Sequence, residues 1–292
     1  MNTNIFFKFF DFQVKPMLLY ASEIWGLSNI ECIESSHLFA IKRLLCVSDK
    51  TPNTLAYGET GRYALYVDAT MSAIRYWLKV LKMPNTRFPK QCLLHMTNMM
   101  ERRGQYCYIT PWAKKVKDCL IKHGYEQVWN DKGARNERIL LTELKSKLVD
   151  EFKQEWHQKL LDSDRFAFYR SFKQSFFKEQ HLDNITIKRF RDTFTRFRLG
   201  LNELGVNKRF SGQHNKNCPF CPSSFEDEHH FMFICPKYQH LRLKYLSNNI
   251  NFITHESNVH NIFEIKDEQK QRALGMYIFY SLKLREECES KI

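Results

Sequence analysis

The amino-acid sequence predicts a mainly α-helical fold with one short β-hairpin. Glycine and proline are few, 10 and 8 in 292 residues, which favours helices with short connections over turn-rich sheets. Apolar residues recur at three- and four-residue intervals along much of the chain, the spacing of a helix with one buried face. A hydrophobic fraction of 43% is sufficient for a buried core.

Four helices are predicted in the first part of the chain. Ser28 can cap the first helix, Thr51-Pro52-Asn53 is expected to break the chain after it, and Gly124 is expected to end the fourth. The segment 126–135 is polar and is the best candidate for a linker, which predicts one helical domain over residues 1–130 and a second over 136–292. The predicted helices of the first part cover residues 28–47, 62–82, 90–103 and 110–124.

The second part of the chain is expected to begin with a long charged helix. An aromatic helix follows it, then a basic helix, a short helix and a closing helix. The segment 247–260 is rich in asparagine and serine and is expected to be a loop. The predicted helices of the second part cover residues 136–162, 164–178, 187–201, 236–246 and 265–288.

The basic helix at 187–201 combines an apolar stripe with a run of cations. Ile187, Phe190, Phe194, Phe197 and Leu201 fall on one helical face. The cations fall largely off that face, so we expect them to point to solvent or to a partner, where arginine forks match phosphate groups. An ordinary solvated amphipathic helix is the alternative. The candidate nucleic-acid-binding residues are Lys188, Arg189, Arg191, Arg196 and Arg198, with Lys208 and Arg209 in the loop that follows.

A cysteine-rich stretch gives the most specific signal in the sequence. Cys218 and Cys221 are two residues apart, and His230 and Cys235 follow, so the pattern reads C-x2-C-x8-H-x4-C. Three sulfur ligands and one imidazole nitrogen suit zinc, whereas calcium and magnesium require oxygen ligands. The sequence therefore predicts a small zinc knuckle over residues 214–240 that holds one Zn²⁺. Four protein ligands leave no open coordination position, so the predicted site is structural.

The ligand assignment leaves alternatives. His229 is a second candidate for the nitrogen ligand, although His230 gives the four-residue interval to the last cysteine that zinc knuckles use. A redox pair is disfavoured because a proline follows each cysteine, and a disulfide is disfavoured because nothing in the chain indicates secretion. Chance proximity of buried cysteines is the remaining alternative.

The charge distribution points to polyanionic partners. The formal net charge is +13, and residues 1–60 carry 5 Lys/Arg against 6 Asp/Glu, so the positive excess belongs to the rest of the chain. A field of this sign attracts nucleic acid, with acidic membranes as a weaker alternative. No signal peptide or transmembrane segment is evident, which predicts a protein of the nucleus or cytoplasm and no membrane partner.

Several short motifs, in order, resemble the C-terminal region of non-LTR (LINE-type) retrotransposon reverse transcriptases of invertebrates. Within residues 10–250 they precede and include the cysteine stretch, whose Glu226 to His230 (E-D-E-H-H) fits the family's terminal zinc-binding segment. The resemblance implies that Cys218, Cys221, His230 and Cys235 are zinc ligands and that this region helps to hold template RNA or target DNA. The other motifs are K-P-M-L-L-Y-A-S-E-I-W-G (15–26), T-P-N (51–53), Y-G-E-T-G-R-Y (57–63), R-Y-W (75–77) and T-R-F-R (195–198).

The polymerase core of that family is missing from this sequence. The Tyr66-Val67-Asp68-Ala69 segment lacks the second aspartate of a polymerase turn and has helical periodicity. We therefore expect a non-catalytic protein that binds RNA first and DNA second, and that can pair with a polymerase encoded elsewhere. The competing hypothesis is a zinc-stapled helical scaffold or protein-interaction module that does not bind nucleic acid.

Overall fold

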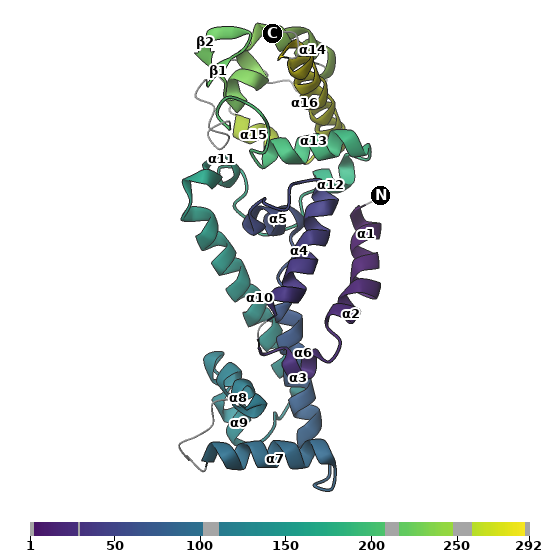
Figure 1. The fold of residues 1–292 in the computed structure, drawn as a ribbon, viewed down its shortest axis with the longest axis vertical. Coiled ribbons are helices and arrows are strands. Elements are labelled where there is room, and N and C mark those ends of the chain that lie inside the picture. Colours follow the sequence, from purple (N-terminus) through teal and green to yellow (C-terminus); the bar gives the residue numbers. More distant parts are fainter. Residues whose placement is uncertain (1–2, 29, 102–110, 208–215, 248–258, 290–292) are drawn as a thin grey trace. The chain divides into compact units, whose positions relative to one another are not determined.

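The computed structural model describes residues 3–28, 30–101, 111–207, 216–247 and 259–289 (Figure 1). The fold is mainly α-helical, with one two-stranded antiparallel sheet within those residues, which confirms the predicted fold class. Lys208 and Arg209, two predicted site residues, lie outside the described residues. None of the helices in the described part of the chain has the length and apolar character needed to cross a membrane.

The chain divides into two compact units, each assembled from separate stretches of sequence. The first comprises Met1–Lys8, Phe39–Arg62 and Trp156–Ile292, and the second comprises Phe9–Leu38 and Tyr63–Glu155. The predicted division at residues 130–136 falls inside the second unit. The first half of the segment 126–135, expected to be a linker, instead forms α9 (Glu126–Asn130), whose Trp129 stacks on Trp77 at 5.5 Å between ring centroids. That aromatic contact makes the segment part of a core.

The second unit is organised around α6 (Tyr66–Leu81). Val67, Ile74 and Trp77 of this helix are at most 1% exposed, and they share one apolar core with residues of α7, α8 and α10. The helix packs against α3, α7 and α8. The remaining elements that begin in this unit are η1 (Phe10–Val14), α2 (Lys15–Leu18), α3 (Ser22–Trp25), α4 (Glu31–Leu45), α7 (Phe88–Glu101), α8 (Trp112–Lys122) and α10 (Glu137–Leu161).

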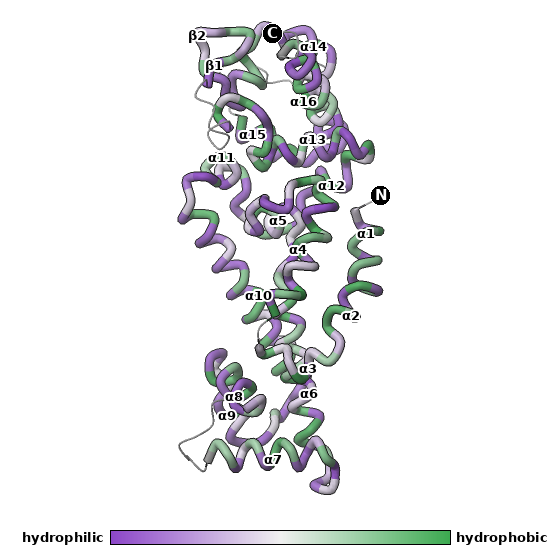
Figure 2. Tube along the Cα trace, in the orientation of Figure 1, coloured by the Kyte–Doolittle hydropathy of each residue, from purple (hydrophilic) through white to green (hydrophobic). Residues whose placement is uncertain are grey.

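The first unit is organised around the pair α13 (Lys188–Arg198) and α16 (Glu268–Glu289), which pack against each other. Most of α13 is hydrophilic (Figure 2), yet Phe190, Phe194 and Phe197 of the predicted stripe are at most 5% exposed. The prediction is wrong for Ile187, which precedes the helix and is 51% exposed. The other elements that begin in this unit are α1 (Thr3–Phe9), α5 (Asn53–Thr60), η2 (Asp164–Phe166), α11 (Ala167–Arg170), α12 (His181–Asn184), β1 (Asn217–Cys218), β2 (Cys221–Phe225), η4 (His230–Ile234), η5 (Pro236–Tyr238), α14 (Gln239–Tyr245) and α15 (Val259–Phe263).

The prediction of an aromatic helix over residues 164–178 is wrong beyond its first turns. Helix α11 ends at Arg170, turns and bends follow, and Lys178 then forms a β-bridge with Thr60. Gly61 permits this close approach, because a Cβ at this position would lie 2.3 Å from the backbone nitrogen of Lys178, and its φ is +62°. Tertiary pairing with this distant segment therefore overrides the helical pattern.

Helix α5 was not predicted, because Thr51-Pro52-Asn53 indicates a break. The break is present, but Pro52 is also the residue that precedes the first turn of a helix. A proline has no N–H to lose at a helix start, so it permits a new helix as readily as it ends the preceding one. Helix α5 carries Glu59, which is fully buried.

Candidate metal centre

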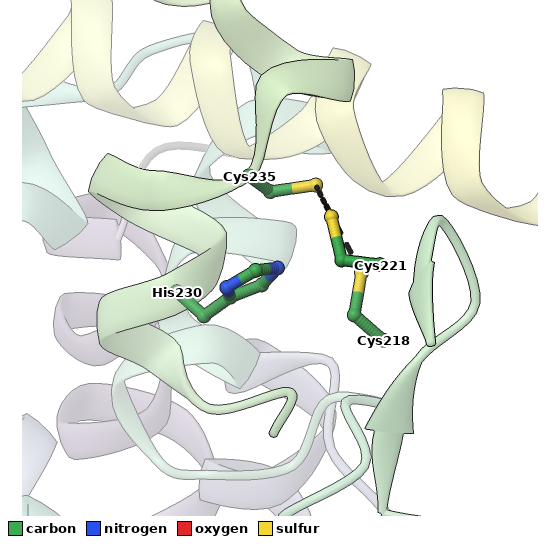
Figure 3. Close-up of side chains that lie close together, drawn as sticks. All are labelled: Cys218, Cys221, His230 and Cys235. Atoms are coloured by element: carbon green, nitrogen blue, oxygen red, sulfur yellow. Dashed lines mark hydrogen bonds between the residues drawn. The ribbon is translucent and has the colours of Figure 1, made fainter. Parts of the chain in front are cut away.

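Cys218, Cys221, His230 and Cys235 converge in the first unit (Figure 3). One ligand atom from each side chain lies within 4.8 Å of all the others. The Sγ atom of Cys235 lies 3.8 Å from that of Cys218 and 3.9 Å from that of Cys221. A tetrahedral site with metal–sulfur bonds of about 2.3 Å has sulfur–sulfur edges of about 3.8 Å. These sulfur separations fit tetrahedral coordination of one ion, and they are too long for a disulfide.

The hairpin supplies two of the sulfurs. Cys218 ends β1, Cys221 begins β2, and the two residues pair across the Pro219-Phe220 turn. The backbone N–H groups of Phe220 and Cys221 donate toward the Cys218 sulfur, which helps to lower the pKa of this thiol. The tight turn therefore both brings the two cysteines together and stabilises a thiolate.

Cys218 and Cys235, the first and last ligands in the sequence, are each followed by a proline, and both prolines affect the hydrogen bonding of the cysteine sulfur in the same way. In Cys218-Pro219-Phe220 and Cys235-Pro236-Lys237, the proline has no N–H, and the next residue donates its N–H toward the cysteine sulfur. Hydrogen bonds from backbone N–H groups to sulfur orient metal-binding cysteines and stabilise their negative charge. The repeated Cys-Pro pair thus has a structural role at both ends of the cluster.

A π turn, η4, supplies the other two ligands. The N–H of Cys235 donates to the carbonyl oxygen of His230 at 2.9 Å, and the N–H of His230 donates to Oδ1 of Asp227 at 2.7 Å. In an α-helix, residues five apart point about 140° away from each other. The wider π turn brings them toward the same side. His230 and Cys235 can therefore face one ion although they are five residues apart.

The structure places His230, and not His229, beside the three sulfurs. His230 is 4% exposed, and its Nε2 is buried without a hydrogen-bond partner among the described residues. His229 is half-buried and packs on the Phe233 ring at 5.2 Å. A buried imidazole nitrogen without a partner is unfavourable unless it binds something, so this orphaned atom fits a metal ligand.

The three thiols cannot all ionise easily without a cation. The Cys235 thiol beside Cys218 lowers the pKa of Cys218 to about 5, and the same contact raises the pKa of Cys235. Burial raises the pKa of Cys221. A thiolate at Cys218 therefore disfavours ionisation of the neighbouring Cys221 and Cys235 thiols. The positive charge of a bound cation would offset this repulsion and so favour the thiolate forms that coordinate metal. The cluster can hold a metal ion.

A buried ion pair holds the segment between β2 and η4, which connects the two halves of the cluster. Arg285 of α16 donates to both carboxylate oxygens of Glu226, at 2.8 and 2.9 Å, and both side chains are at most 2% exposed. Glu226 also accepts a hydrogen bond from the N–H of Gly205 at 2.8 Å. Its own N–H donates to the carbonyl oxygen of Lys216. Glu226 thus ties together α16, the segment before the hairpin and the end of β2.

The remaining acidic residues of the E-D-E-H-H motif also have structural partners. Asp227 accepts from the His230 N–H, as described above, and Glu228 accepts from Asn207 Nδ2 at 3.0 Å. Burial raises the pKa of Glu228. The carbonyl oxygen of Phe231, inside the π turn, accepts from the hydroxyl of Tyr277 on α16 at 2.8 Å. The motif therefore positions the ligands, and α16 contacts both Glu226 before the π turn and Phe231 near its start.

Two of the predicted nucleic-acid-binding arginines are buried, so the expectation that they point to solvent is wrong. Arg191 is 4% exposed and Arg198 is 2% exposed. Arg198 pairs with Glu59 at 3.3 Å and with Glu179 at 3.0 Å, and donates to the carbonyl oxygen of Phe263 at 2.8 Å. Helix α13 is covered on more than its phenylalanine stripe, and buried cations beside that stripe are paired with carboxylates.

The other three cations of α13 are exposed. Lys188 forms an ion pair with Asp192, one turn along the helix. The guanidinium of Arg189 lies 4.9 Å from the Phe190 ring centroid and 5.5 Å from that of Phe279. Arg196 lines a hollow of about 410 Å³ with Lys283 of α16. Among the described predicted residues, Lys188, Arg189 and Arg196 remain available to an external partner.

Sequence reasoning missed the pairs formed by Glu59 with Arg198 and by Glu226 with Arg285. Their partners are separated by 139 and 59 residues. No local spacing signals such pairs, because helical and strand periodicities describe one element at a time.

Comparison with family models, with curated proteins and with solved structures gave no match.

Proposed function

We propose that this protein binds nucleic acid, with a preference for RNA over DNA. A zinc ion bound by Cys218, Cys221, His230 and Cys235 keeps the binding region folded. The observation that carries the proposal is the Cys₃His cluster, with its orphaned His230 nitrogen and tetrahedral sulfur spacing. Small modules of this ligand set commonly contact single-stranded nucleic acid.

The donor set favours zinc over other ions. Three thiolates and one imidazole suit a borderline-soft ion with tetrahedral coordination. All four positions are taken by protein groups, so the ion's role is to hold the hairpin and the π turn together. No position is left for a reacting water, which supports a non-catalytic role for this centre.

Exposed cations provide the second line of support. Lys188, Arg189 and Arg196 are exposed on α13, and Lys216, Lys237 and Lys244 are exposed close in sequence to the ligands. Lys237 lies 5.3 Å from the centroid of the Phe220 ring in the hairpin turn. Phe225 at the end of β2 is 46% exposed. Phosphate contacts by cations and base stacking on an exposed aromatic ring are the usual means of binding single strands.

The resemblance to the C-terminal region of LINE-type reverse transcriptases belongs to the same proposal. In that interpretation the chain contributes binding and leaves polymerisation to a partner. Asp68, the one aspartate of the incomplete polymerase-like segment, pairs with Lys15 and lies 3.7 Å from Lys145. A carboxylate already paired with two lysines is a poor ligand for magnesium.

The test is the affinity of the zinc-loaded protein for single-stranded RNA across a salt series. Arg189→Gln with Arg196→Gln should weaken binding and make the slope of log affinity against log salt shallower by about 1.4, since each phosphate contact contributes roughly 0.7 for single strands. The matched control is Lys79→Gln with Lys82→Gln, which removes the same charge from exposed positions of the second unit. It should change the slope far less.

The second candidate function is a zinc-stapled helical scaffold that binds no nucleic acid. The burial and ion pairing of Arg198 favour it, because this cation of α13 stabilises the interior. Absence of RNA binding at low salt by folded, zinc-loaded protein would establish the scaffold and overturn the nucleic-acid proposal. If the slope of log affinity against log salt is the same for the α13 variant and the control, α13 does not contribute to the binding surface.

A further inference from the structure

The second unit contains a cavity of about 800 Å³ that the metal centre does not involve. Its described lining lies within residues 77–132 and comes from helices α6, α7, α8 and α9, together with Pro111 before α8 and Lys132 after α9. Cavities of roughly 300–1,000 Å³ are the size that small organic ligands occupy. Its volume therefore fits a small molecule or one inserted group better than a folded partner.

One side of this cavity is apolar and aromatic. Trp77 and Trp129 both line it, and their rings stack with planes inclined by only 12°. Leu94 is 40% exposed and Met99 is 43% exposed, and both line the same cavity. Covering such exposed apolar side chains with an apolar group is favourable, because it removes apolar surface from water.

The other side carries an excess of positive charge. Lys90, Lys114, Lys117 and Lys132 line the cavity, and Asp118 is the one acidic residue among its described lining residues. The ammonium of Lys90 donates to the carbonyl oxygen of Leu81 at 2.7 Å. Lys114, Lys117 and Lys132 have no ion pair or hydrogen-bond partner for their ammonium groups within the part of the chain that the structure describes. Three such ammonium groups on one side of a cavity whose other side is apolar favour an anionic ligand.

We propose that this cavity binds a small organic anion whose aromatic or aliphatic body lies against Trp129 and the leucine and methionine side chains. Its carboxylate, sulfonate or phosphate group is held by Lys114, Lys117 and Lys132. Apolar burial supplies most of the affinity, and the lysines supply selectivity for the charged head. Lys115, which lies between Lys114 and Lys117 in the sequence, is not part of the proposed site. Its ammonium donates to the Ser28 hydroxyl at 2.7 Å.

The experiment uses the full, zinc-loaded chain and 8-anilinonaphthalene-1-sulfonate, a planar aromatic anion that fluoresces when it leaves water. One saturable site is expected, with quenching of tryptophan emission. Lys114→Gln with Lys117→Gln should weaken binding by about tenfold, as expected for loss of two charge-assisted contacts that are partly solvated. The matched control is Lys115→Gln with Lys122→Gln, which makes the same charge change on the same helix outside the cavity lining, and it should bind like the wild type.

The neutral probe N-phenyl-1-naphthylamine separates the two sides of the site. It has the same ring body without the sulfonate, so it should bind the wild type more weakly than the anion does. Its affinity should be the same for the Lys114→Gln/Lys117→Gln variant and for the Lys115→Gln/Lys122→Gln control. Equal affinities of the sulfonate for the two double variants would overturn the proposal, as would several weak sites. Displacement of the sulfonate by an oligothymidylate, with the same lysine dependence, would also overturn it and assign the cavity to a nucleic-acid surface.

Discussion

The N–H of Cys235 donates to the carbonyl oxygen of His230 at 2.9 Å, so two residues of the candidate metal centre close one π turn together. The bond fixes the separation of the two ligands through the backbone. Single π turns inside helical segments often mark functional positions. Here the wider turn has a defined consequence, because it directs His230 and Cys235 to the same side.

The choice between the two adjacent histidines gives the first prediction. His230→Ala should abolish stoichiometric zinc binding or lower zinc affinity by more than tenfold, because it removes one of four ligands. His229→Ala should retain about one zinc per chain, since His229 packs on Phe233 away from the sulfurs. A competition titration with a chromogenic chelator measures both. Loss of zinc only in the His229 variant would contradict the assignment.

Metal removal gives the second prediction. A ligand that binds only the folded state at a thousandfold excess over its Kd adds about 4 kcal/mol of stability. Treatment with a strong chelator should therefore lower the Tm and make the hairpin segment 216–225 sensitive to proteases, because little apolar surface holds the hairpin. Cys92→Ser, which alters a cysteine outside the cluster, should keep the same chelator response. Unchanged proteolysis after complete zinc removal would show that the hairpin folds without the ion.

The buried pair between Glu226 and Arg285 gives the third prediction. Arg285→Leu should destabilise the protein by about 3–5 kcal/mol, because it leaves a buried carboxylate without its cation. Glu226→Gln with Arg285→Leu should recover part of that loss. The control is Arg272→Leu, whose partner Glu268 is 54% exposed, and its effect should be within about 0.5 kcal/mol. Denaturant unfolding of zinc-loaded protein measures all three, and similar losses for Arg285→Leu and Arg272→Leu would contradict the prediction.

The buried histidine of α12 gives the fourth prediction. His181 is 1% exposed, and its Nε2 lies 3.0 Å from Thr195 Oγ1 and 3.5 Å from Glu59 Oε2. Burial, reinforced by Arg198, Lys173 and Arg191, lowers the pKa of His181 well below 6.5. Between the folded pKa and 6.5 the unfolded chain binds more protons than the folded chain. This histidine therefore adds stability above pH 6.5, which is lost as the pH falls through that window.

The loss from His181 amounts to about 1.4 kcal/mol for each pH unit within that window. The measurement is the difference in unfolding free energy between wild type and His181→Gln at several pH values, both zinc-loaded, so that titration of the metal ligands cancels. The difference should shift in favour of the variant as the pH falls from 7 to 5. A difference that is independent of pH would contradict the prediction.

The parts that the sequence predicted are those set by local spacing. The cluster was predictable because Cys218, Cys221, His230 and Cys235 lie close together along the chain, and a tight turn and one π turn gather them. The phenylalanine stripe of α13 was predictable for the same reason, since the three- and four-residue rhythm of Phe190, Phe194 and Phe197 specifies one face. The identity of the ion as zinc stays a prediction.

The parts that were not predictable depend on distant partners. Nothing in the local sequence distinguishes Arg198 from a surface arginine. It can be buried because Glu59 and Glu179 supply paired carboxylates. The segment after Arg170 has helical periodicity, yet Lys178 pairs with Thr60, where Gly61 leaves room for the backbone. Helix propensity is a weak preference that tertiary contacts override. A single sequence does not reveal which distant side chain will supply the partner.

The close spacing of the four ligands has a consequence for the order of folding. Closing a short loop costs little chain entropy and takes well under a microsecond. The hairpin and the π turn can therefore meet around an ion before the distant end of the chain arrives. Glu226 accepts Arg285 from α16, across 59 residues of sequence, so that pairing requires a much longer loop to close. We therefore expect that, during refolding with zinc present, capture of the ion precedes docking of α16, so that the last helix docks on a surface that is already formed.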